Sequence, residues 1–211
     1  MIPGAYDDFP EGFFDRTDDT PDSEFYAPVR LVTHLDSSAR AAVGELYLEL
    51  GLDGSSTGPR RVLDLMSSWI SHFLSPPAEL TVLGMNALEL EHNRDAASRV
   101  VHDLNADPRL PFTDESFDGA VCCVSVDYLI HPIEVFDEVA RVLVEGGVFA
   151  VTFSNRCFSS KAITGWLATD DITHVQIVAE YFRRSTRWHP PEVDERPSAD
   201  DPLFAVWARR A

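Results

Sequence analysis

The stretch Arg61-Val-Leu-Asp-Leu-Met-Ser-Ser-Trp-Ile70 decides the fold of this chain. Residues 62–65 form a short apolar run that is typical of a buried strand, and Asp64 stands one position before its end. The residues that follow predict a short helix over 67–74, which the pair Pro76-Pro77 ends. A strand that runs directly into a helix is the repeating unit of an α/β sheet.

Outward from this stretch, strand and helix patterns alternate, which predicts a parallel sheet with crossover helices. An acidic, proline-rich loop (190–202) precedes a last apolar strand, 203–209, and a strand near 185–189 would complete an antiparallel hairpin with it at the sheet edge. The expected strands before the hairpin are 61–65, 80–84, 99–102, 118–125 and 147–153, and the expected helices are 67–74, 87–93, 132–143 and 174–183.

The first 24 residues differ from the rest in composition. They hold eight acidic side chains against one arginine, so the segment cannot bury enough apolar area to order itself. We expect residues 1–24 to be a mostly mobile acidic tail, unless Phe9, Phe13 and Phe14 dock it onto the body as a lid.

Residues 25–59 predict a helical N-terminal cap. Apolar residues recur at helical spacing from about residue 28, and Asp36 resembles the N-cap of a second helix that ends at a Gly/Ser loop. The remaining residues, 60–211, form the predicted α/β domain.

Charge and cysteine content exclude several classes of protein. Seventeen basic residues, of which only Lys161 is a lysine, stand against 35 acidic ones, so no basic patch is available for the phosphates of a nucleic acid. The chain has no apolar run near 18 residues and begins with an acidic segment, which predicts neither a membrane span nor a secretory signal. Three cysteines make no disulfide framework, and we expect a reducing cytoplasm.

Several motifs resemble those of class I S-adenosylmethionine (SAM) methyltransferases, in particular the type 11, ubiquinone-methyltransferase-like group. The resemblance covers about residues 60–210 and implies a doubly wound, mostly parallel, seven-stranded Rossmann-like sheet with a C-terminal antiparallel hairpin. The motifs are Asp64-Leu65 at the end of the first strand, Leu80–Asn86, Val101–Asn105 with Leu110–Asp118, and the Val139–Val148 run with its Gly-Gly turn.

The resemblance implies where SAM would bind, at the carboxyl ends of the strands. Asn86 occupies the position of an acid that holds the ribose hydroxyls, and an amide there implies weaker ribose binding. Asp103 and Leu104 fit the position that contacts the adenine, and the alternative for Asp103 is that it only caps a turn. The implied cofactor-binding residues are Asp64, Met66, Ser67, Ser68, Trp69, Asn86, Asp103, Leu104 and Ser125.

The family's glycine-rich turn is replaced in this chain. Met66, Ser68 and Ile70 stand in the three glycine positions, which removes the freedom to adopt positive φ and to approach a ligand closely. The hydroxyls of Ser67 and Ser68 at a helix N-terminus would favour an anion such as the methionine carboxylate, and Trp69 would pack over the cofactor or in the core.

Methyl transfer requires placement of the acceptor and, for some acceptors, a base, so catalytic candidates come from the rim of the site. His34 is the best candidate base, with Tyr26 and Tyr128 as further catalytic candidates. Tyr26, Arg30 and His34 recur at four-residue spacing and would share a helix face, unless the helix begins only at Pro28, after Tyr26.

These observations predict SAM-dependent methyl transfer to a small molecule, with no metal, nucleic-acid or membrane ligand. The alternative is a catalytically silent methyltransferase fold that acts as a binding or regulatory protein, because the glycines and the ribose acid are absent. A protein partner is possible under either hypothesis.

Overall fold

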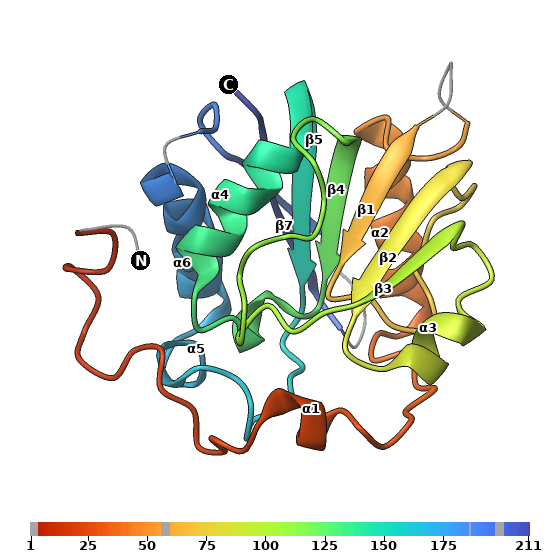
Figure 1. Ribbon diagram of the computed structural model, residues 1–211. Coiled ribbons are helices and arrows are strands. Elements are labelled where there is room, and N and C mark those ends of the chain that lie inside the picture. Colours follow the sequence, from red (N-terminus) through yellow and green to blue (C-terminus); the bar gives the residue numbers. More distant parts are fainter. Residues whose placement is uncertain (1–3, 56–59, 186, 197–200) are drawn as a thin grey trace.

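The computed structural model describes residues 4–55, 60–185, 187–196 and 201–211. Seven strands form one sheet in the order β3-β2-β1-β4-β5-β7-β6 (Figure 1). The first five strands run parallel and β7 runs antiparallel between β5 and β6, which confirms the predicted doubly wound sheet with its hairpin. The strands are β1 (Arg61–Leu65), β2 (Glu79–Gly84), β3 (Ser98–Val101), β4 (Phe117–Cys123), β5 (Leu143–Phe153), β6 (Glu192–Arg196) and β7 (Leu203–Arg209).

Helices cover both faces of the sheet, and an apolar core lies under each layer (Figure 1). Phe136 and Phe182 belong to the core on the side of α4 and α6, whereas Val43 and Tyr47 of α2 belong to the other core. The helices are α1 (Asp22–Phe25), α2 (Ser37–Glu49), α3 (Ala87–His92), the short η1 (Val126–Tyr128), α4 (Pro132–Val142), α5 (Thr164–Leu167) and α6 (Asp171–Ser185). None of the helices in the described residues is long and apolar enough to cross a membrane.

Two predicted elements of the main domain are wrong. Residues 67–74 form no helix, because the chain after β1 makes its hydrogen bonds to β2 and to side chains instead. The hairpin partner of β7 is β6, in the loop expected to be irregular, while the stretch near 185–189 contributes only an isolated bridge from Trp188 to Arg210. Residues 186 and 197–200 of these predictions lie outside the described part of the chain.

The N-terminal cap is only partly helical. Asp36 caps α2 as predicted, with its side chain accepting a hydrogen bond from the Ala39 amide. The helix expected from residue 28 is absent, so Tyr26, Arg30 and His34 do not share a helix face. We refer to residues 26–36, an irregular segment between α1 and α2, as the strap. Residues 56–59 of the predicted cap lie outside the described residues.

Of the two alternatives for the acidic segment, the structure shows the docked one for residues 4–24. Phe13 packs against Gly165, where an added Cβ would lie 2.3 Å from the ring, and Phe9 and Phe14 pack near Tyr181. Lys161 is fully buried and donates to the carbonyls of this segment. Figure 1 shows the segment and α1 running across the end of the sheet at which the parallel strands finish.

Candidate active site

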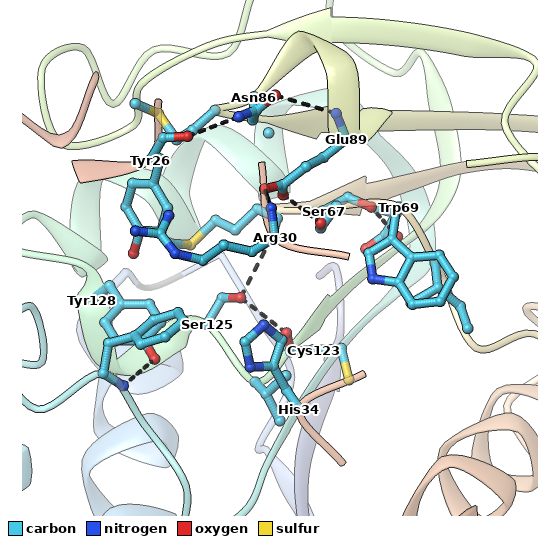
Figure 2. Close-up of a pocket in the computed structure, with 18 of the residues that line it drawn as sticks. Tyr26, Arg30, His34, Ser67, Trp69, Asn86, Glu89, Cys123, Ser125 and Tyr128 are labelled. Atoms are coloured by element: carbon cyan, nitrogen blue, oxygen red, sulfur yellow. Dashed lines mark hydrogen bonds between the residues drawn. The ribbon is translucent and has the colours of Figure 1, made fainter. Parts of the chain in front are cut away.

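A cavity of about 530 Å³ lies at the carboxyl ends of the parallel strands, beneath the strap (Figure 2). Its volume is within the range of small-molecule sites, and its place is where open α/β sheets bind ligands. Every residue predicted for the site lies in its lining. These residues are Tyr26, His34, Asp64, Met66, Ser67, Ser68, Trp69, Asn86, Asp103, Leu104, Ser125 and Tyr128.

The turn after β1 contains a residue in the left-handed conformation, although that residue is not a glycine. Met66 adopts φ 55°, so the expectation that its side chain would deny the turn positive φ is wrong. The Ser67 amide donates to the Leu83 carbonyl over 2.7 Å, which ties the turn to β2. The turn packs closely against β2 because residue 84 is a glycine. A Cβ at Gly84 would lie 2.1 Å from the Ser67 carbonyl oxygen.

This turn does not form the predicted anion site. Residues 67–74 form no helix, so there is no helix N-terminus behind the hydroxyls of Ser67 and Ser68. Ser67 donates its hydroxyl to Asp64 over 2.6 Å, and Ser68 donates to Glu89 over 2.6 Å. Burial raises the pKa of Asp64 to about 7, against the opposing effect of its serine hydrogen bonds.

Both the oxygen and the nitrogen of the Asn86 side-chain amide make hydrogen bonds within the protein. Its oxygen caps α3 by accepting from the amides of Leu88 and Glu89. Its nitrogen donates to the carbonyls of Tyr26 and Ala27 over 2.9 and 3.1 Å (Figure 2). A carboxylate could not make these donations, which gives a structural reason for an amide at this position.

Two further side chains fasten the strap over the cavity. Glu89 accepts from the Arg30 backbone amide over 2.7 Å while its other oxygen accepts from Ser68. Trp69 donates its indole N–H to the Val32 carbonyl over 2.8 Å. Ser68 and Asn86, which depart from the family pattern, therefore take part in holding the strap, together with Trp69 between two of the replaced glycines.

Near Asp103 and Asn105, the cavity is bordered by the docked N-terminal segment. One oxygen of Asp103 accepts from the amides of Asn105 and Ala106, which is the turn-capping role expected of it as an alternative. Asn105 donates to Asp22, which also accepts two hydrogen bonds from Arg16 at 2.8 and 2.9 Å. No sequence pattern indicated Asp22 as a residue of the site, because Asn105 lies 83 positions further along the chain.

Of the three catalytic candidates, His34 alone has a pKa suited to a base. Burial lowers the pKa of His34 below its usual value, so the imidazole is neutral at pH 7. Burial raises the pKa of Tyr26 and of Tyr128, which keeps both phenols protonated. His34 meets the Phe158 ring edge-on at 5.3 Å, and Phe158 donates its amide to the Tyr128 hydroxyl.

Polar residues that follow β4 and β5 divide between the cavity lining and its surroundings. Asn155, Arg156 and Cys157 line the cavity, whereas His131 does not. Arg156 pairs with the buried Asp201, and burial raises the pKa of the Cys157 thiol, so this cysteine is not an activated nucleophile.

The sheet order and the cavity at its carboxyl edge define the class I methyltransferase fold. A family model described as "Methyltransferase domain" matches residues 66–151. Fold and family match agree with the predicted class: the chain has the fold of class I methyltransferases, and residues 66–151 are similar to their methyltransferase domain.

Known proteins resemble the chain over different extents. The biotin biosynthesis bifunctional protein BioHC of Teredinibacter turnerae is 35% identical over 66 residues, which are 31% of this chain and 12% of that protein's length. The [4+2]-cyclase SpnF shares the fold with a TM-score of 0.57 at 15% identity, over 81% of each chain. Geranyl diphosphate C-methyltransferase from Streptomyces coelicolor, in complex with Mg²⁺, geranyl diphosphate and S-adenosylhomocysteine, gives a TM-score of 0.53 at 14% identity, over 81% of this chain and 77% of its own.

Proposed function

We propose that this chain transfers the methyl group of SAM to a small-molecule acceptor bound beneath the strap. The observation that supports this proposal most strongly is the lining of the cavity. All of the residues at the family's cofactor-binding positions, although altered in sequence, line one partly enclosed cavity. SAM supplies a methyl group on a positively charged sulfur, which leaves with the bonding electron pair as the thioether S-adenosylhomocysteine. The solved Streptomyces neighbour, which binds a small molecule in addition to this product, supports the assignment by analogy.

In this proposal His34 accepts the proton that the acceptor loses as its new bond to carbon forms. The neutral imidazole and its place in the cavity lining support this role. Tyr26 and Tyr128 remain protonated and would orient the acceptor by hydrogen bonding.

His34→Ala is expected to slow transfer from radiolabelled SAM to a low-molecular-weight acceptor fraction by roughly 100-fold or more, while S-adenosylhomocysteine still binds. Because the pKa of His34 lies below 6.5, the wild-type rate should rise with pH and level off by about pH 7. His189→Ala, which changes an exposed histidine, is the control and should not alter the rate. Equal rates for His34→Ala and wild type would refute the role of His34.

A binding or regulatory protein is the second candidate function. It is favoured by one observation, that Ser68, Trp69 and Asn86 make hydrogen bonds within the protein that hold the strap. If those bonds close the cavity permanently, wild type will bind neither SAM nor its product, whereas the proposed transferase must bind both.

A further inference from the structure

We propose, on the basis of the methyltransferase function above, that Arg30 is the residue that binds a carboxylate inside the cavity. The carboxylate belongs either to the methionine part of SAM or to the acceptor. The proposal rests on the position and the partners of the guanidinium, on the charges around it, and on the absence of a helix after β1.

Neutral groups hold the Arg30 guanidinium in place. It donates to the carbonyls of Pro28 and Phe25 over 3.2 and 2.9 Å. Its carbon lies 4.9 Å from the centre of the Phe25 ring and 5.8 Å from that of Phe158. Carbonyls and aromatic rings orient a cation but do not neutralise its charge, so the guanidinium is fixed and still able to pair with an anion.

Arg30 differs in this respect from Arg156, the other arginine in the lining. The Nε of Arg156 pairs with the buried carboxylate of Asp201. Among the described residues no carboxylate forms an ion pair with the Arg30 guanidinium, since Glu89 accepts only from the backbone amide of Arg30. Five N–H groups are available to a guanidinium, and the two carbonyls leave donors for a ligand.

A carboxylate in this cavity needs such a cation. The lining includes the acidic residues Asp22, Asp64, Glu89 and Asp103, which repel an anion when ionised. In this chain the turn after β1 offers no helix N-terminus, and the Ser67 amide is already bonded to Leu83. Arg30 supplies the positive charge that this turn does not.

Calorimetric titration of wild type and Arg30→Gln with S-adenosylhomocysteine and with 5′-methylthioadenosine tests the proposal. The second nucleoside lacks the amino-acid part and so carries no carboxylate. If Arg30 holds the cofactor's carboxylate, the substitution weakens S-adenosylhomocysteine binding by roughly 10- to 100-fold and leaves 5′-methylthioadenosine binding unchanged, which also shows that the variant is folded. Arg183→Gln, which removes an exposed charge on α6, should change neither affinity.

If Arg30 instead holds the acceptor's carboxylate, both nucleoside affinities stay the same. Benzoate should then raise the melting temperature of S-adenosylhomocysteine-saturated wild type and not that of Arg30→Gln. Equal nucleoside affinities together with an equal response to benzoate would overturn the proposal. If wild type binds neither nucleoside, the methyltransferase function itself fails, and the benzoate comparison without nucleoside decides the carboxylate site.

Discussion

Asn86→Asp is expected to detach the strap from the cavity while leaving α3 intact. Aspartate caps a helix as well as asparagine does, so the bonds to the Leu88 and Glu89 amides survive. The other end of the side chain would place a carboxylate oxygen against the carbonyls of Tyr26 and Ala27 and lose both donations. We expect a loss of about 2 kcal/mol in the local stability of the strap.

The backbone amide of Arg30, which donates to Glu89, reports this opening in hydrogen exchange. Its exchange should become about 30-fold faster in Asn86→Asp. Asn86→Ser is the matched control: it retains a capping oxygen and loses the donations, but adds no charge, so its effect should be smaller. Exchange at Arg30 within threefold of wild type in Asn86→Asp would show that Asn86 does not hold the strap.

Lys161→Met is expected to lower the free energy of unfolding by about 3–5 kcal/mol. The ammonium group of this buried lysine donates to the carbonyls of Asp18 and Thr20 and lies 3.2 Å from the Asp22 carboxylate. Methionine fills similar space but leaves the carbonyls without a donor and removes a cation from beside a buried acid. Urea denaturation measures the loss.

A less buried contact of the same segment provides the control. Asp8, whose side chain is 84% exposed, pairs with Arg184, so Asp8→Asn should cost no more than about 1 kcal/mol. A Lys161→Met protein within 1 kcal/mol of wild type would show that the buried lysine does not anchor the N-terminal segment.

Sequence patterns predicted the sheet because its determinants are local. Buried apolar runs such as Val62–Leu65 and Leu203–Arg209 mark strands without reference to their neighbours. The edge strand β6 was not predicted because its charged residues resemble a solvated loop, although charge on an edge strand also prevents further strand pairing.

The strap and the turn after β1 depend on contacts that no local pattern reveals. Asn86 and Glu89 bind a segment about 60 positions earlier in the chain, and Trp69 binds one 37 positions earlier. The cofactor-binding residues of the cavity were predicted by their place at strand ends. What each side chain does there depends on the strap, so Asn86 and Trp69 serve purposes that the family pattern does not include.

Although it lacks the glycine-rich turn, we propose that this chain binds SAM beneath its strap. Calorimetric titration of the wild-type protein with S-adenosylhomocysteine tests it most directly. We predict one site per chain with a dissociation constant in the micromolar range. No detectable heat of binding at millimolar ligand, from a protein shown to be folded, would contradict the claim.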